Sequence, residues 1–131
     1  MMTINGTLLL WGTLGGGLGA LCRYTSVYSF SRLSRLFWLG NLAANILGCF
    51  SLGLFLNFLD FDLNNLTAAQ FFWLGAIAGL TTLSGLFIDG QKLLVQGRSA
   101  IFRFIFVSVA TGLVAYSAGF YGFSWLHTGL Q

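Results

Sequence analysis

The sequence predicts an all-α integral membrane protein with four transmembrane helices, and three observations carry that prediction. Of the 131 residues, 56% are hydrophobic and only 7% are charged, and the mean hydropathy is +0.83. Proline is absent, and the apolar residues fall into four long stretches. Because soluble domains carry about a quarter charged residues, the composition excludes a soluble enzyme, a nucleic-acid-binding protein and a disordered chain. The expected surroundings are a lipid bilayer, with no nucleic acid as partner.

Each apolar stretch is long enough to cross a membrane as a helix. About 20 helical residues span a hydrocarbon core of about 30 Å, and a helix satisfies its own backbone hydrogen bonds in lipid. We therefore expect a single transmembrane domain, residues 1–131, with helices over residues 7–27, 37–59, 68–88 and 100–126. Short polar connections separate the helices, at Ser29–Arg35, Asp60–Thr67 and Asp89–Ser99.

The basic residues predict one fixed orientation in the membrane. All six flank the first or the third connection: Arg23, Arg32, Arg35, Lys92, Arg98 and Arg103. The second connection carries Asp60 and Asp62 but no base, and neither terminus carries a basic side chain. The positive-inside rule then places the first and third connections in the cytoplasm and both termini outside the inner (plasma) membrane of the cell.

Small residues recur at helical spacing within the apolar stretches. They stand three or four positions apart, at Gly12, Gly16, Gly19, Gly40, Ala44, Gly48, Gly75 and Gly79. Such faces let helix backbones approach closely in lipid, and they predict a compact bundle or a dimer. Cys22 and Cys49 lie inside apolar stretches without metal-binding spacing, so we expect them to be small core residues without a disulfide.

Two asparagines are placed where a polar side chain is expensive. Asn41 and Asn45 stand one turn apart and share a face of the second helix. At membrane depth each must find a partner or line a wet cavity. Two interpretations are open: the amides clamp neighbouring helices together, or their N–H groups, chiefly those of Asn45, face an anion path.

The run from Gly79 to Gly85 makes the third helix a poor continuous helix. It contains two glycines, two threonines and a serine within seven residues. An interruption there would free backbone carbonyls for a cation and hydroxyl groups for an anion. A helix that is kinked but continuous, with its hydroxyls bonded to the preceding turn, is the equal alternative.

Three other polar positions have an ordinary explanation beside a functional one. On the fourth helix Ser108 and Thr111 are one turn apart, and hydroxyls there commonly bond within their own helix. Arg23, at the cytoplasmic end of the first helix, either extends to the membrane interface or attracts anions to a vestibule. We expect no specific role for His127 near the outer terminus.

The chain lacks the groups that other membrane functions require. We expect no acidic side chain at mid-membrane, and hence no carboxylate relay of the kind that a proton-coupled exporter uses. No nucleophile–base pair or metal-ligand cluster is evident, so we do not expect an enzyme. Hydroxyl and amide groups with no buried acid suit a small anion or a purely structural role.

Three motifs, in order across nearly the whole chain, resemble the small four-helix fluoride channels of the Fluc (CrcB) family. They are a glycine–arginine motif in the first helix, an asparagine motif in the second and the interrupted third helix. In this sequence they read Gly16–Tyr24, Leu39–Gly48 and Gly75–Ser84. Their order, together with four spans and this length, makes the resemblance fairly specific.

The resemblance implies an antiparallel dimer with two pores that pass fluoride in single file. The pore hydrogen-bond donors that it implies are Asn45, Ser84 and Ser108. The further positions expected at the pore are Thr82, Leu83, Leu86 and Phe104. It also implies a structural Na+ ion at the dimer interface, held by the main-chain carbonyls of Ala78 and Thr81. Because fluoride is small and strongly hydrated, closely placed donors must replace its water, and the positive edges of aromatic rings can supplement them.

The sequence departs from the family pattern where the pore is most demanding. Leu83 and Leu86 stand where two phenylalanines are usual, and Gly85 stands between them in place of a threonine. Phe104 replaces a tyrosine of the fourth helix, and Ala78 replaces a glycine. Pore-facing groups are therefore lost together, whereas the interface and fold motifs survive.

A fixed orientation and an altered pore together favour a subunit that pairs with an oppositely oriented homologue. A homodimeric member inserts in both orientations and needs little charge bias, whereas this chain has a strong one. We therefore expect passive fluoride export by a heterodimer. Two alternatives remain open: a non-conducting structural or assembly subunit, and a homodimeric channel with an altered pore.

Overall fold

A computed structural model of the chain describes residues 5–33, 36, 38–58 and 66–128. Every regular element among these residues is helical, as the composition predicted. In chain order the elements are α1 (Gly6–Leu33), α2 (Leu39–Phe58), α3 (Ala68–Leu80), α4 (Leu83–Leu93), the short 3-10 helix η1 (Leu94–Gln96) and α5 (Arg98–Thr128).

Within these residues, three segments are long and apolar enough to cross a membrane, namely Leu39–Phe58, Ala68–Gln96 and Arg98–Gly122. The second of them contains the break between α3 and α4. The glycine-rich α1 is not among the three, although it has 28 residues and packs along α3. The chain is thus a multi-pass membrane protein whose third segment is interrupted.

The contacts between helices show which of them run in the same direction. Gly15 faces Phe72 and Gly19 faces Ala76, so α1 and α3 are parallel. Gly53 of α2 faces Tyr116 of α5, and residues further along both helices also meet, so α2 and α5 are parallel. The two pairs run in opposite directions, since α2 meets α4 in reverse order. Consecutive crossings of a membrane require this alternation.

Glycine is required where α1 meets α3. A Cβ atom on Gly15 or Gly19 would collide with the backbone of α3, and one on Gly75 or Gly79 would collide with the backbone of α1. The helices therefore touch along their main chains, which is how small residues drive association in lipid. The close helix contact predicted from the small-residue spacing is confirmed here.

The α2–α5 pair is built in the same way. Cβ atoms on Gly53 and Gly119 would each collide with the opposite backbone. Asn57 of α2 donates from its side-chain amide to the carbonyl of Phe120 in α5. The two cysteines differ from expectation: both are free, but Cys22 is exposed and Cys49 only half-buried. Both were expected in the core, and for Cys22 this is wrong because the face of α1 that carries it is uncovered.

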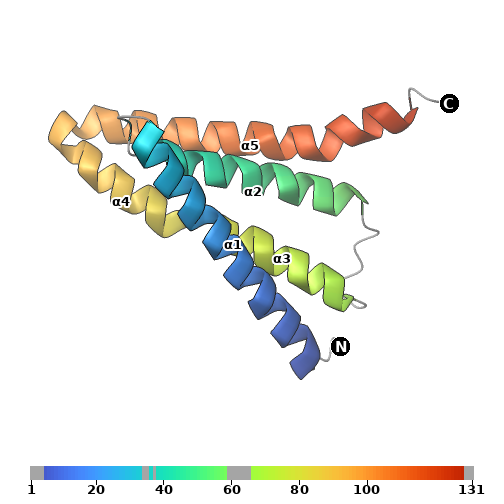
Figure 1. The fold of residues 1–131 in the computed structure, drawn as a ribbon. Helices are drawn as coiled ribbons and strands as arrows, with labels where there is room; N and C mark the ends of the chain where they lie inside the picture. Colours follow the sequence, from blue (N-terminus) through green and yellow to red (C-terminus); the bar gives the residue numbers. More distant parts are fainter. Residues whose placement is uncertain (1–4, 34–35, 37, 59–65, 129–131) are drawn as a thin grey trace.

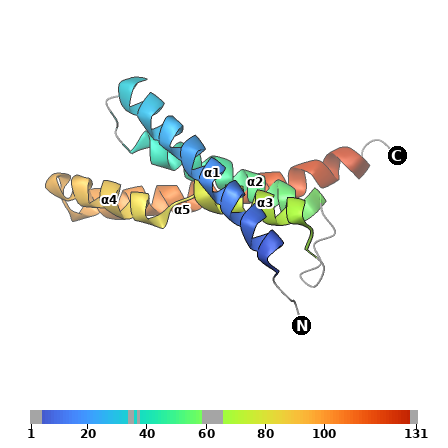
Figure 2. The same ribbon diagram turned by 60° about the horizontal axis from the view of Figure 1, so that its bottom comes forward.

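The two helix pairs diverge instead of closing into one compact bundle. Figure 1 shows the α1–α3 pair and the α2–α5 pair joined toward the left and separating toward the right, and Figure 2 shows α1 crossing obliquely over the other helices. A cavity of about 710 Å³ opens between α1, α2 and α3, with walls that include Leu18, Phe55 and Trp73. Few apolar side chains are buried among the described residues, namely Ala44, Phe55, Leu93 and Phe104.

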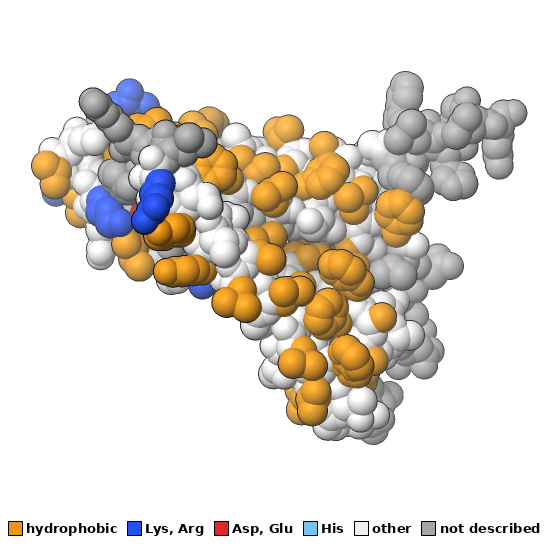
Figure 3. Space-filling view, viewed as in Figure 1, with side chains coloured by type: hydrophobic (Ala, Val, Ile, Leu, Met, Phe, Trp, Pro, Cys, Tyr) orange, Lys and Arg blue, Asp and Glu red, His pale blue; other side chains and the backbone are white. Residues whose placement is uncertain are grey.

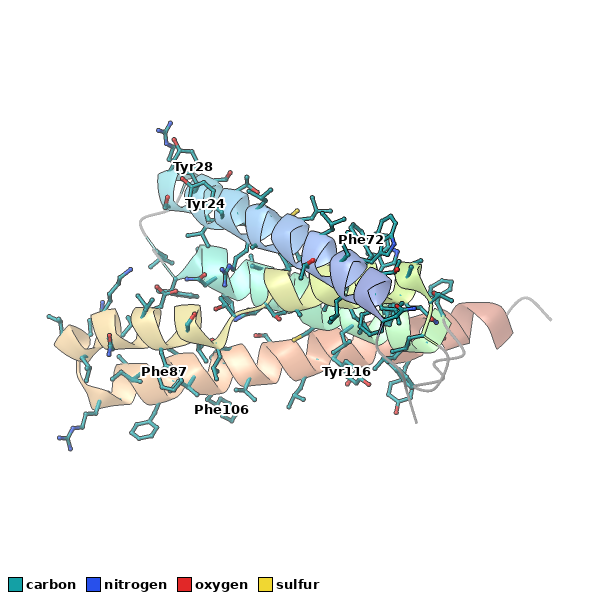
Figure 4. The ribbon with its side chains drawn as sticks, turned by 90° about the horizontal axis from the view of Figure 1, so that it is seen from below. Tyr24, Tyr28, Phe72, Phe87, Phe106 and Tyr116 are labelled. Carbon is teal, nitrogen blue, oxygen red and sulfur yellow. The ribbon has the colours of Figure 1, made fainter. Side chains whose placement is uncertain are left out.

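The first helix is longer than expected. It continues past Val27 to Leu33, so the described part of the predicted connection Ser29–Arg35 is largely helical. Tyr24 and Tyr28 stack with ring centroids 6.3 Å apart, and the guanidinium of Arg32 lies 4.6 Å from the centroid of the Tyr28 ring. These contacts stabilise the last turns, and Figure 4 shows the two tyrosines on α1. Arg35 and residues 60–65 of the second connection lie outside the described residues.

The third connection is much shorter than the predicted Asp89–Ser99. Helix α4 and η1 continue to Gln96, and the turn into α5 is made at Gly97, whose φ of 104° favours glycine. Asp89 lies inside α4 and is 2% exposed, so the expectation that the chain has no buried acid is wrong. Its carboxylate is tolerated because Asn41 and Lys92 face it.

The basic side chains gather at one end of the molecule. On the face seen in Figure 3, lysine and arginine side chains lie toward the left, whereas hydrophobic side chains are spread over the middle and lower part of the molecule. We call this end the basic end. It contains the helix ends that flank the first and third connections, where the sequence carries its basic residues.

Candidate functional site

The predicted interruption of the third segment is present, and it lies at Thr81 and Thr82. Both residues are extended, with φ and ψ of −84° and 148° at Thr81 and −152° and 127° at Thr82. The hydroxyl of Thr82 caps α4 by accepting a hydrogen bond from the N–H of Gly85 at 3.2 Å. The alternative of a continuous, kinked helix is therefore wrong.

Asn45 of α2 holds the extended backbone of the break. Its Oδ1 accepts from the N–H of Thr82 at 2.8 Å, and its Nδ2 donates to the carbonyl of Thr82 at 3.3 Å. The side chain thus acts as a clamp between α2 and the break. An amide nitrogen carries two hydrogens. Only one of them is needed for the bond to Thr82, so the second N–H of Asn45 is available for another hydrogen bond.

The break releases carbonyl groups from their usual helical partners, and those of Ala78 and Thr81 are among them. In a continuous helix the N–H of Thr82 would bond to the carbonyl of Ala78, and that of Gly85 to the carbonyl of Thr81. Here these donors bond to Asn45 and to the Thr82 hydroxyl instead. The carbonyl of Ala78 keeps a contact from the Thr81 hydroxyl at 3.4 Å. These are the two carbonyls to which the family resemblance assigns a Na+ ion.

A groove lies beside the break, between α2, α4 and α5. Its volume is about 440 Å³, and its polar lining includes Asn45, Thr81, Thr82 and Ser108. Most of the remaining wall is apolar and includes the leucines Leu83, Leu86 and Leu113. Leu83 is 68% exposed and Leu113 is 62% exposed, so the groove is open on the side of these two leucines, where no other part of the described chain covers it.

The hydroxyl groups beside the groove differ in how their hydrogens are used. Ser108 is buried and donates to the carbonyl of Phe104 in its own helix at 2.8 Å. The hydroxyls of Thr82 and Ser84 lie 2.8 Å apart, and either can be the donor. A pair of hydroxyls has two hydrogens and needs one for its mutual bond. The Thr82–Ser84 pair can therefore donate its other hydrogen without breaking any bond, whereas Ser108 must rotate.

Not every predicted site residue lies in the groove. Ser84 is exposed and meets the groove through Thr82. Phe104 is buried, with its ring edge against Trp38 at a centroid distance of 5.8 Å, and it does not line the groove. Arg23 is half-exposed on α1 and lines neither the groove nor the cavity between α1, α2 and α3.

The sequence interpretation missed part of the groove wall. Gly112 and Tyr116 of α5 line it together with Ser108, and all three fall on one face at successive turns. The four-residue spacing from Ser108 carried this signal. Figure 4 shows Tyr116 on α5 toward one end of the molecule and Phe87 on α4 toward the other, with the break between them.

The fold and the groove define a class of protein. Half-helices that meet at an unwound, polar point inside a membrane-spanning segment are the building blocks of ion and solute pathways. Irregular backbone at membrane depth is tolerated only where protein buries it or where it lines a water-filled cavity. The chain is therefore a small multi-pass membrane protein of the channel or transporter class.

Comparison with known proteins identifies the family. Residues 10–120 match the family described as "CrcB-like protein, Camphor Resistance (CrcB)", and the chain belongs to that family. It is 32% identical over 123 residues to a protein of Francisella philomiragia, covering 88% of this chain and 94% of the relative. It is 39% identical over 114 residues to one of Salinibacter ruber, covering 85% of both. Both relatives are named "Fluoride-specific ion channel FluC"; they are ion channels and not enzymes.

Proposed function

We propose that the chain is a subunit of a fluoride-selective channel that exports fluoride passively from the cytoplasm. One observation carries the proposal: the groove beside the break presents amide and hydroxyl groups and has no acid among its lining residues. A carboxylate in such a place would repel an anion and attract a cation. Relatives that cover most of this chain are named for fluoride transport.

The donors beside the groove suit a small, strongly hydrated anion. Asn45 offers its second amide hydrogen, and the Thr82–Ser84 pair offers one hydroxyl hydrogen. Ser108 adds a third donor once it turns from the carbonyl of Phe104. Fluoride would exchange its water for these groups, and the apolar walls at Leu83 and Leu86 would keep other water away.

The pathway needs a second subunit. The groove is open on the side of Leu83 and Leu113, and in a membrane lipid chains would fill it unless protein covered it. The divergence of the helix pairs leaves a second opening of about 710 Å³. A homologous subunit in the opposite orientation would close both, and its aromatic rings would replace those absent at Leu83 and Leu86.

The one-sided charge distribution favours a different chain as that partner. A dimer of two identical, oppositely inserted copies would place the basic end of one copy on the outside, against the positive-inside rule. We therefore place both termini outside the inner membrane and assign the opposite orientation to a homologue. The leucines also support a second candidate, in which this subunit assembles the dimer and the partner alone lines a working pore.

A structural Na+ ion fits the carbonyls of Ala78 and Thr81. Both have lost their helical donors to Asn45 and to the Thr82 hydroxyl, so their oxygens are available to a hard cation. Ala78 is exposed, which suits an ion shared with a second subunit. The ion would fasten the break of one subunit to that of the other and leave the groove donors to the anion.

Fluoride efflux from liposomes tests the proposed function. The chain reconstituted alone should release trapped fluoride at least about tenfold more slowly than the chain co-reconstituted with a phenylalanine-bearing homologue, a difference of about 1.4 kcal/mol in barrier. The partner alone, at the same protein-to-lipid ratio, is the control. Equal and fast efflux from the lone chain would favour a homodimer. No efflux above the control in any mixture would contradict the proposal.

Exchange of sodium for potassium tests the cation site. We expect the dimer in detergent to dissociate more readily in K+ than in Na+ at equal ionic strength, as measured by size-exclusion chromatography. In Asn45→Ala the N–H of Thr82 is free to return to Ala78, so the dependence on Na+ should weaken. Identical dissociation of the native protein in both salts would rule the site out.

A further inference from the structure

One buried charge of the chain is not used by the proposed pathway. Asp89 of α4 is the largest fully buried side chain among the described residues, with 2% exposure. Nδ2 of Asn41 donates to its Oδ2 at 2.7 Å, and Nζ of Lys92 lies 3.7 Å from its Oδ1. Each carboxylate oxygen thus faces a donor, one from α2 and one from α4 itself.

Asn41 also occupies the space above Gly85. A Cβ atom on Gly85 would lie 2.9 Å from Oδ1 of Asn41 and 2.8 Å from Cγ2 of Thr82. Both distances are too short for carbon next to these atoms, so a side chain at position 85 requires Asn41 to move. Gly85 stands where the family resemblance calls for threonine, and the Asn41 side chain explains that departure physically.

The two asparagines hold α4 at two points. Asn45 binds the backbone of Thr82, which directly precedes α4. Asn41, one turn before Asn45 on α2, binds Asp89 in the second half of α4. Apart from these bonds α4 packs mainly on α5. The hydroxyl pair Thr82–Ser84 lies at the start of α4, so the position of this pair depends on how α4 sits against α2.

The negative charge of Asp89 would affect an anion in the groove, and Asn41 is one of the two residues that face it. Asp89 does not line the groove itself, but it lies three residues beyond Leu86 on the same helix, and Leu86 forms part of the groove wall. At low effective dielectric, a carboxylate that lacks hydrogen-bond donors repels a nearby anion strongly. Removing Asn41 would leave Oδ2 without its donor while Lys92 still faces Oδ1, and losing a hydrogen bond to a charged group is costlier than losing a neutral one.

We infer that Asn41 is a positioning and shielding residue for the anion path. Its amide fixes α4 against α2 and covers the carboxylate of Asp89, and Gly85 is glycine to make room for it. This inference rests on the proposed function, because the shielding matters only if an anion passes the groove. The fit between Asn41 and Gly85 stands independently of it.

Fluoride efflux tests the shielding by asking whether Asp89→Asn rescues Asn41→Ala. The assay uses the assembly that conducts with the native chain, either the chain alone or the chain with its homologue. Asn41→Ala should slow efflux at least about tenfold, because Oδ2 of Asp89 then loses its hydrogen bond and only Lys92 still balances the negative charge. Asp89→Asn, which keeps an acceptor for Asn41, should leave efflux close to native, and in the Asn41→Ala background it should restore most of the loss. A loss of purely structural origin would not be rescued by removing a charge.

Asn57→Ala is the matched control, since it removes an amide from the same helix at the far end. Its efflux should not respond to Asp89→Asn. Failure of Asp89→Asn to rescue Asn41→Ala would overturn the shielding, provided that the native protein conducts. A native protein that does not conduct would instead count against the proposed function.

The steric fit is tested by thermal unfolding in detergent, which needs no transport. Gly85→Ala should lower the apparent Tm of the native chain, and should lower it less in the Asn41→Ala background, where the space above position 85 is vacated. Equal decreases in both backgrounds would show that Asn41 and Gly85 are independent and would overturn the inference.

Discussion

Asn45→Asp is expected to reduce fluoride efflux by at least about a hundredfold. The carboxylate can still accept the N–H of Thr82, but it cannot donate to the carbonyl, and it places a fixed negative charge in the groove. Two like charges about 4 Å apart repel by about 4 kcal/mol at the effective dielectric of a protein surface, which exceeds the barrier needed for that loss. The measurement is efflux from liposomes with a fluoride electrode.

Gln91→Glu is the matched control for this change. It also converts an amide to a carboxylate, on an exposed position of α4 that does not line the groove. Efflux through this variant should remain near the native value. If Asn45→Asp conducted as well as Gln91→Glu, Asn45 would serve only as the clamp on the break, and the anion path would have to lie elsewhere.

Gly79→Leu is expected to prevent the folded protein from accumulating. A Cβ atom alone would collide with the backbone carbonyl of Gly16, and a leucine would force α1 and α3 apart along their whole contact. Helix association in lipid depends on such close packing, and overpacking a tight contact costs about 1–3 kcal/mol or more. The measurement is the yield of monodisperse protein after extraction from the membrane.

Gly17→Leu separates this effect from the general cost of replacing a helical glycine. Gly17 lies in α1, and a Cβ atom there would meet nothing within 4 Å. We expect its yield to match that of the native chain. Equal yields of the Gly79→Leu and Gly17→Leu proteins would mean that the main-chain contact between α1 and α3 does not hold the fold together.

Much of the fold could be predicted from the sequence because lipid leaves few choices. Stretches such as residues 37–59 must be helical to satisfy their backbone groups. The glycine spacing in α1 and α3 predicted a close contact, and the structure places these residues against facing main chains. The glycines and hydroxyls from Gly79 to Gly85 identified the break, although composition alone did not decide between a break and a kink.

The errors arose where a local pattern was overruled by a distant partner. Asp89 was assigned to a loop because an acid is costly inside a span, but Asn41 and Lys92 face its carboxylate within the helix. The contact of the Phe104 ring with Trp38 was not foreseen either, although the expected role of Phe104 at the pore stays a prediction. Neither outcome follows from residue type and spacing, since both depend on which helix faces which.

Accessibility of the groove in the assembled protein tests the central claim most directly. The measurement uses Ser108→Cys, at a position that lines the groove, in a background with Cys22→Ser and Cys49→Ser. The protein is treated with silver ions, which are small and bind thiolates. If the groove is the fluoride path, silver should block efflux through Ser108→Cys and leave the cysteine-free protein unaffected. A cysteine at position 108 that stays unmodified in an assembly that still conducts would show that fluoride does not pass this groove.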